Sequence, residues 1–347
     1  MGIARIQGDV VFDDSYFDQS WLTAGWSKGH DMRQGPAYFA PMSALGVNFG
    51  TTCMVVAPAA TTGAKARAVF ETPIPLLSMT NEVKTGTSRS RTRIEVLRTV
   101  TGDKVHFKLT GTIKKTDKPN RIYKSIASPQ AFFRQMFKVE MDLRGVKVSG
   151  AYRHGKTPKG TTSVTSLSSD TISIIVGKMN KWSSNYMAEA VLKTVGAEVS
   201  GRPGTTAKGV AQMEKMLVKM GNASSDFRVV NGSGLSRQIK MSASLVNSLM
   251  VQLYWDDLVG PEFLSSMSIG GEDGTLRYRF RDKGQSGRVR GKTGSLSGIY
   301  TLTAFVNGGD GEVYVMTFLT NGIKGGSRKV RNLQDRFASK ILALPAN

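Results

Sequence analysis

The sequence has little of what cysteine or histidine chemistry requires. Its 347 residues include a single cysteine, Cys53, so no internal disulfide can form. Cys53 lies in the apolar run 53–56, which favours a buried structural thiol. The three histidines, His30, His106 and His154, do not show the spacing of metal ligands. Neither a histidine-based metal site nor a Ser-His-Asp triad is therefore expected, and no cofactor is predicted.

Long apolar runs are also missing. No uncharged apolar stretch approaches the roughly 18 residues that a membrane-spanning helix needs, so no transmembrane segment is predicted. Residues 1–6 lack the apolar stretch of a signal peptide. The hydrophobic content of 40% and the charged content of 21% are typical of a folded globular protein.

Acidic residues are scarce relative to basic ones. The chain has 47 Lys and Arg against 26 Asp and Glu, a net charge of +21. The charge is uneven: −2 over residues 1–50, +14 over 51–160 and +9 over 161–347. Such a field attracts nucleic acid, anionic lipid surfaces or acidic cell-wall polymers. A solvated basic surface without a specific partner explains it equally well.

The hydrophobic pattern changes character near residue 129. Between about 51 and 125, short β-type stretches are predicted at 52–57, 91–100 and 105–113, with a hairpin turn at Thr101-Gly102-Asp103. Helices are predicted at 129–145, 168–179, 184–196, 206–220 and 242–254. The last part is predicted to form strands 300–306 and 312–319 and then an amphipathic helix. The pattern predicts an α/β (α+β) fold for the C-terminal half.

Two Lys-Thr-Gly tripeptides are present, at 292–294 and at 84–86. A lysine ammonium and a threonine hydroxyl on an edge strand can hold a carboxylate by charge-assisted hydrogen bonds, and a glycine lets a ligand approach the strand. The later copy follows Gly291 and precedes an apolar strand, whereas the earlier copy runs into a polar basic loop. We therefore select the later copy, although a basic turn is the alternative interpretation of each.

The tripeptide Ser183-Ser184-Asn185 stands where a helix is predicted to begin. The simplest interpretation is a helix N-cap, because serine and asparagine side chains satisfy free backbone donors there. The functional alternative is that the serine hydroxyl relays a proton while the asparagine amide positions a substrate amide. Ser-x-Asn and Lys-Thr-Gly elements occur together in serine β-lactamases and penicillin-binding proteins, which favours the functional interpretation.

Longer strings carry a family resemblance. They are NYMAEAVLK at 185–193, NGSGLSR at 231–237 with Asn231 in place of an aspartate, GEDGTL at 271–276, and segments 6–17 and 38–45. With the two tripeptides, in the family's order, they make the chain resemble the class C penicillin-binding proteins, a family of serine D-Ala-D-Ala carboxypeptidases and endopeptidases. The resemblance spans nearly the whole chain and is densest over 180–320.

The resemblance implies a hydrolase that forms an acyl-enzyme on the D-Ala-D-Ala peptide of peptidoglycan stem peptides, with β-lactams as substrate mimics. It implies catalytic roles for Ser183, Asn185 and Lys292, and substrate binding by Lys292, Thr293, Gly294 and Ser295. The implied fold is a β-lactamase/transpeptidase-like domain with inserted β-rich domains. The expected limits are 1–50 for part of the first insertion, 51–128 for the second insertion and return segment, and 129–347 for the catalytic domain.

One family element is missing from these 347 residues: no lysine has a serine three positions before it. The Ser-x-x-Lys nucleophile and an export signal are expected before residue 1. The hypotheses are a truncation product, a misassigned start, a gene remnant, or a non-catalytic paralogue. The full-length family member is expected in the periplasm or elsewhere outside the cytoplasm.

Two rival functions are compatible with the sequence. The first is a non-catalytic peptidoglycan-binding or scaffolding protein that keeps the carboxylate pocket of Lys292 and Thr293. The second is a basic nucleic-acid-binding protein, motivated by the +14 charge over residues 51–160. That segment has few aromatics among its basic residues and no recognisable recognition helix, so nucleic acid is not the expected partner. Anionic cell-envelope polymers remain a possible partner for the charge.

Overall fold

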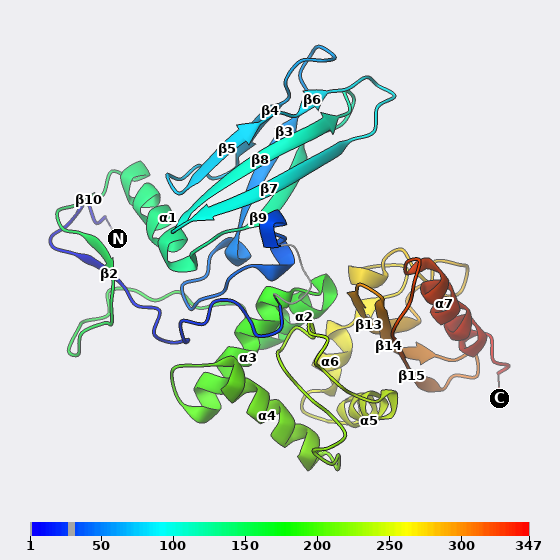
Figure 1. The fold of residues 1–347 in the computed structure, drawn as a ribbon. Helices are drawn as coiled ribbons and strands as arrows, with labels where there is room; N and C mark the ends of the chain where they lie inside the picture. The colour runs from blue at the N-terminus through cyan, green and yellow to red at the C-terminus, as the bar shows by residue number, and fades with distance from the viewer. Residues whose placement is uncertain (1, 27–31, 347) are drawn as a thin grey trace. The chain divides into compact units, whose positions relative to one another are not determined.

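The computed structural model describes residues 2–26 and 32–346 of the chain. The chain divides into two compact units, each containing helices and strands. Unit 1 consists of Met1–Val164 and Glu189–Gly209, and unit 2 of Thr165–Ala188 and Val210–Asn347. The mixture of helices and strands confirms the predicted α+β class (Figure 1). The predicted domain limits 1–50, 51–128 and 129–347 stay a prediction.

Two sheets, one antiparallel and one mixed, form the middle of unit 1. The first has the order β4-β3-β9, and the second the order β5-β8-β6 with β7 paired along β8. Their strands are β3 Thr51–Ala57, β4 Arg67–Phe70, β5 Leu77–Asn81, β6 Lys84–Thr85, β7 Arg93–Thr101, β8 Lys104–Ile113 and β9 Asn120–Ser125. This confirms the predicted β-rich stretch, and β7 and β8 join at the predicted Thr101–Asp103 turn.

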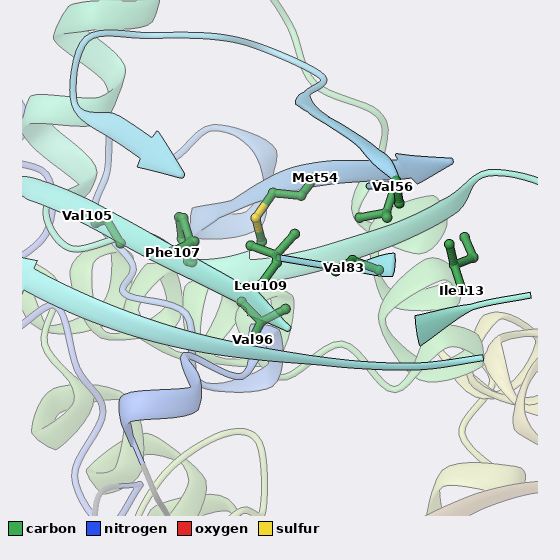
Figure 2. Packing of buried hydrophobic residues seen from close by; sticks show 9 residues of the cluster. Met54, Val56, Val83, Val96, Val105, Phe107, Leu109 and Ile113 are labelled. Carbon is green, nitrogen blue, oxygen red and sulfur yellow. The ribbon is translucent and has the colours of Figure 1, made fainter. Parts of the chain in front are cut away.

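Alternation along β8 builds the core of these sheets. Val105, Phe107 and Leu109 are buried, while the residues between them lie on the outer face. Figure 2 shows them packed with Met54 and Val56 of β3. Such alternation is what one buried sheet face requires. Cys53 on β3 is buried, as predicted for a structural thiol, and burial raises its pKa.

A smaller aromatic cluster anchors the first residues of unit 1 to helix α1 (Pro129–Leu143). The ring of Phe12 packs edge-on against Phe133 and Phe137 of this helix, at centroid distances of 5.8 and 5.4 Å. Ser128 caps α1 by accepting the N–H of Ala131 at 3.1 Å. The short elements are β1 Arg5–Ile6, β2 Val10–Phe12, β10 Lys147–Val148, β11 Tyr152–His154, η1 Met32–Gln34, η2 Ala37–Phe39 and η3 Asn48–Gly50.

Unit 2 is built on the antiparallel sheet β12-β13-β14-β15. On one face of β14, Leu302 and Ala304 pack against Ala338 of helix α7. On the opposite face, the ring centroid of Phe305 lies 5.3 Å from that of Tyr254 in helix α5. The strands are β12 Ser268–Ile269, β13 Val289–Leu296, β14 Ile299–Asn307 and β15 Val313–Thr320. The helices lying wholly or partly in unit 2 are α2 Ile172–Trp182, α3 Asn185–Ser200, α4 Thr206–Lys219, α5 Ala243–Tyr254, α6 Gly260–Ser266, η4 Gly274–Leu276 and α7 Arg328–Leu342.

Most helices and strands lie where the hydrophobic pattern predicts them. The terminal β-β-α arrangement is confirmed: β14 and β15 pair antiparallel, and α7 follows β15 and packs against β14. Helix α2 begins at Ile172 rather than near residue 168, because the residues before Thr171 are exposed and lack a regular hydrogen-bonded structure. Helix α6 and strand β12 were not predicted. None of the described helices is long and apolar enough to cross a membrane.

A buried ion pair fixes helix α3 within unit 1. The Nζ of Lys193 lies 2.6 Å from Oδ1 of Asp18 and 2.9 Å from the carbonyl oxygen of Ser20. The Lys193 side chain is 1% exposed and that of Asp18 is 25% exposed. A buried ammonium is tolerated only when such partners replace its water. The lysine of the 185–193 string therefore has a structural role.

Replacing Lys193 with alanine should destabilise unit 1 by about 3 kcal/mol, because Asp18 and the Ser20 carbonyl would lose their shared partner. Urea-induced unfolding followed by circular dichroism would measure the loss. Lys215→Ala, at an exposed position of α4, is the control and should change the free energy of unfolding by less than about 0.5 kcal/mol. Equal stability of the two variants would contradict this assignment.

Candidate active site

The turn between α2 and α3 positions Ser183. Ser183 ends α2 in the left-handed conformation, with φ 55° and ψ 48°. A residue with a side chain adopts this conformation at a cost of roughly 1–2 kcal/mol. The backbone N–H of Ser184 donates to the carbonyl of Met179 at 3.0 Å, and its hydroxyl accepts the N–H of Met187 at 3.3 Å. The N-cap interpretation thus applies to Ser184, while Ser183 presents its exposed side chain elsewhere.

Strand β13 carries the Lys-Thr-Gly element on an open edge. Its neighbour β12 pairs with it only at Arg290 and Gly291. Beyond Gly291, no other strand among the described residues pairs with this edge of β13. On the other side β13 pairs continuously with β14. At Gly294 a side chain would collide with the hydroxyl of Thr301 on β14, so the glycine is also required by packing within the sheet.

The Lys292 ammonium joins the two motifs. Its Nζ donates to Oγ of Ser183 at 2.7 Å and to the carbonyl oxygen of Thr293 at 2.8 Å. No carboxylate of the described residues forms an ion pair with it. Burial among neutral groups lowers the pKa of Lys292 to about 8. A partly desolvated cation with only neutral partners is suited to bind an anionic group of a ligand.

A chain of hydroxyl groups supports Thr293. Its Oγ1 donates to Oγ1 of Thr275 at 2.9 Å. Thr275 lies 3.3 Å from Oγ of Ser268, a fully buried residue of β12, and its backbone N–H donates to the same oxygen at 3.1 Å. These contacts fix the rotamer of Thr293 beside Lys292. The Thr293 hydroxyl can rotate its proton away from Thr275 and donate a hydrogen bond to an anionic ligand instead.

An ion pair connects the end of α2 to the loop that carries Thr275. The Nζ of Lys181 lies 2.5 Å from Oδ2 of Asp273 and 3.0 Å from the Met267 carbonyl oxygen. Burial acts to raise the pKa of Asp273, but hydrogen bonds from Lys181 and from the Ile269 N–H lower it overall. Because Lys181 precedes Ser183 by two residues and Asp273 precedes Thr275 by two, this pair positions both segments.

Gly274 allows this close approach. Its φ is +54°, a region that favours glycine, and a Cβ there would collide with Oγ of Ser268 and lie 2.9 Å from the carbonyl oxygen of Lys181. The glycine of the 271–276 string therefore has a steric explanation.

The predicted site residues lie together on two segments of unit 2. Ser183 and Lys292 are in direct contact, and Thr293 and Gly294 follow Lys292 on β13. Asn185 is the first residue of α3 and is partly buried. Ser295 is exposed and pairs with Tyr300.

Sequence reasoning missed the residues that support this site. Thr275 and Asp273 appear in the sequence analysis only as part of a string, and Lys181 was not singled out. The sequence did contain an indication of their role. A polar loop such as 271–276 whose sequence matches that of a family is expected to contact a functional site. Which motif it contacts could not be derived from spacing.

The rejected Lys-Thr-Gly copy has a structural role in unit 1. Thr85, on β6, is 2% exposed, and its hydroxyl accepts the N–H of Ala59 at 2.9 Å. That hydroxyl is therefore occupied inside the unit.

The histidines lie outside the candidate site as far as the structure describes them. His106 contacts the hydroxyls of Ser78 and Thr80, and His154 packs near Phe12; His30 is outside the described residues. In residues 2–26 and 32–346, no group of three or more His, Cys, Asp or Glu could hold a metal ion.

The hydrogen bond between Lys292 and Ser183 brings a Lys-Thr-Gly strand and a Ser-x-Asn turn together. These are two of the three sequence motifs of serine β-lactamases and penicillin-binding proteins. The chain belongs to the D-Ala-D-Ala carboxypeptidase 3 (S13) family, whose pattern matches residues 1–341. This confirms the family predicted from the sequence strings.

Two relatives show how much of a family member these residues represent. The D-alanyl-D-alanine carboxypeptidase of Actinomadura sp. (strain R39) is 28% identical over 341 residues, which cover 93% of this chain and 61% of the relative. The D-alanyl-D-alanine carboxypeptidase DacB of Haemophilus influenzae is 22% identical, and the match covers 94% of this chain and 67% of the relative. The chain thus spans about three fifths to two thirds of the length of these relatives.

The fold is also that of a solved family structure. Penicillin-binding protein 4 (dacB) from H. influenzae matches with a TM-score of 0.81 at 19% identity, over 99% of this chain and 76% of that one. A second structure of the same protein, complexed with a β-lactam, matches with a TM-score of 0.76. At this level of identity the likeness establishes the fold.

The environment of Lys292 predicts a pH dependence. Burial disfavours the ammonium, so Lys292 should lose its proton with a midpoint near pH 8 instead of the roughly 10.4 of a solvated lysine. Spectra of protein labelled with ¹³C at lysine Cε should show one resonance titrating near 8. That resonance should be absent from Lys292→Gln. A Lys292 resonance that titrates near 10.4 would contradict the assignment.

Proposed function

We propose that this chain provides the carboxylate-binding and proton-relay side of a serine D-Ala-D-Ala carboxypeptidase that acts on peptidoglycan stem peptides. The observation that carries the proposal is the 2.7 Å hydrogen bond between Lys292 and Ser183, which joins the Lys-Thr-Gly strand to the Ser-x-Asn turn. Membership of the S13 family supports it, as do the carboxypeptidase names of the relatives.

Each group has a role that follows from its chemistry. Below about pH 8 the Lys292 ammonium is positively charged and, with the Thr293 hydroxyl, binds the terminal carboxylate of the peptide. The peptide backbone lies along the open edge of β13, where main-chain groups are available for pairing. Asn185 positions a substrate amide, and Ser183 passes a proton to the leaving D-alanine.

The covalent step needs a serine from a Ser-x-x-Lys element, which these 347 residues do not contain. In that step the serine oxygen bonds to the peptide carbonyl carbon, and the serine proton moves to the departing amine as the C–N bond breaks. Water then adds to the ester carbon and releases both the acid and the serine. In this proposal Ser183, hydrogen-bonded to Lys292, delivers the proton to the departing amine.

β-Lactams are proposed ligands because they imitate the same substrate, and the H. influenzae penicillin-binding protein 4 was solved with one. Peptidoglycan as substrate implies action outside the cytoplasm. Hydrolysis of peptide cross-links, an endopeptidase activity, would use the same carboxylate site.

A second candidate is a peptidoglycan-binding protein without turnover. The observation that favours it is an assembled carboxylate site in a sequence without Ser-x-x-Lys. This second function shares carboxylate binding with the carboxypeptidase function, and it differs only in that no covalent acyl-enzyme forms.

The binding step predicts selective recognition of a free carboxylate. Diacetyl-L-Lys-D-Ala-D-Ala should bind the chain, while the same peptide with a C-terminal amide should bind at least about tenfold more weakly, because it lacks the anion that pairs with Lys292. Lys292→Gln should lose this preference. Lys283→Gln, at an exposed position of unit 2, is the matched control and should keep it. Equal affinity of the wild-type chain for acid and amide, measured by NMR titration, would overturn the proposal.

The covalent step predicts a negative result for these residues alone. Fluorescent penicillin should form no stable adduct with the 347-residue chain, because no Ser-x-x-Lys serine is present. Denaturing electrophoresis followed by intact-mass spectrometry would test this. A serine-linked adduct would mean that another serine acts as the nucleophile.

A further inference from the structure

Three segments of unit 1 bring an unusual density of positive charge to one end of a sheet. They are residues 57–67, 84–94 and 112–120, which the structure places together at the carboxyl end of β8, near the label of β6 in Figure 1. We call this region the basic tip. Its cationic residues are Lys65, Arg67, Lys84, Arg89, Arg91, Arg93, Lys114, Lys115 and Lys118. All but Lys114 are exposed, and the three segments contain one carboxylate, that of Asp117.

Strand pairing aligns several of these charges in a row. Lys65 lies directly opposite Lys84, Lys84 is paired with Thr112 of β8, and Thr112 is paired on its other side with Arg93. Paired residues point to the same face of a sheet, so Lys65, Lys84 and Arg93 lie in one row that crosses the three segments.

The Lys65–Lys84 pair is a close one. The N–H of Ala66 donates to Val83 O and the N–H of Thr85 to Ala64 O, each at 2.8 Å. These two bonds flank the lysines and make them a non-hydrogen-bonded pair, in which the Cα atoms lie about 4.5 Å apart. Like charges directly opposite each other are unfavourable in a sheet. An anion bound between them would remove that repulsion.

The protein itself neutralises little of this charge. Arg93 forms an exposed ion pair with Glu95 at 2.8 Å. Asp117 accepts a hydrogen bond from the hydroxyl of Thr92 at 2.5 Å and ties two segments of the tip together. For the other eight cations, no ion pair forms with any residue that the structure describes.

We propose that the basic tip is a binding surface for a polyanion with repeating phosphodiester groups, specifically a polyol-phosphate polymer of the cell wall. The nine cations of the basic tip are spread over three segments. Their distribution suits a ligand that carries negative charge at intervals along its length, because a compact anion would contact only a few of them. The choice of a wall polymer rests on the proposed function, whereas the charged surface does not.

The composition of the tip disfavours two other polyanions. The three segments contain no Phe, Tyr or Trp, so single-stranded nucleic acid would find no stacking platform. They are loops and strand ends without a helix that could enter a DNA groove. They also expose no large hydrophobic side chain that could insert into a lipid bilayer.

The test measures binding of fluorescently labelled poly(glycerol phosphate) to the full 347-residue chain at several salt concentrations. The tip variant is Arg89→Gln, Arg91→Gln, Lys115→Gln and Lys118→Gln, all at exposed loop positions. The control variant removes the same number of arginines and lysines from exposed positions of unit 2: Arg328→Gln, Arg331→Gln, Lys215→Gln and Lys219→Gln. Affinities are compared at equal phosphate concentration with duplex DNA and with phosphatidylglycerol vesicles.

We expect the polymer to bind the wild-type chain and the control variant alike, and the tip variant at least about tenfold more weakly with a shallower dependence on salt. Equal binding by the tip and control variants would overturn the proposal. Tighter, tip-dependent binding of DNA or of vesicles would also overturn it and would assign the surface to that ligand. None of these results bears on the acid-against-amide preference at Lys292, so the proposed function is tested separately.

Discussion

The candidate site is organised around one unpaired cation. Lys292 holds a partly buried ammonium against a serine hydroxyl and a backbone carbonyl, with no carboxylate among the described residues to neutralise it. Burying an ammonium without a counterion costs desolvation free energy, and the negative charge of a bound ligand would offset that cost. The neighbouring features keep this arrangement in place. The left-handed turn directs Ser183 to the ammonium, and the Lys181–Asp273 ion pair fixes the segments on either side.

Two lysines of the chain, one in each unit, hold their charge in opposite ways. In unit 1, the buried Lys193 is paired with Asp18 and hydrogen-bonded to a carbonyl, so its charge serves stability. In unit 2, Lys292 lacks a counterion and lies on an accessible strand edge. The basic tip resembles Lys292 in this respect, since its charges are also left largely uncompensated, but it presents them over a broad surface. The presence or absence of a protein counterion thus distinguishes Lys193, which has a structural role, from the charges for which we propose ligand binding.

Much of the architecture could be predicted from local patterns. The alternation at 105–109 and the apolar spacing of α7 each depend on a single buried face, which the sequence records directly. The choice of Lys292 over Lys84 was also possible, because only the later copy precedes a strongly apolar strand. Long-range partners were not predictable in this way. Nothing in the spacing of Lys181 or Asp273 indicates that they meet, and the row of Lys65, Lys84 and Arg93 exists only because of strand register. Helix α6 was missed because its seven residues are too short to establish a periodicity.

The length of β12 has a further consequence. This strand contributes only two residues, and its pairing with β13 stops one position before Lys292. Two more residues of pairing would cover the backbone of Lys292 and Thr293, while leaving every motif of the sequence unchanged. The exposure of this edge of β13 at Lys292 therefore depends on where the neighbouring strand ends. An insertion between α6 and β12 that lengthened this pairing would cover the strand edge without altering any motif residue, and motif matching alone would fail to detect such a closed protein.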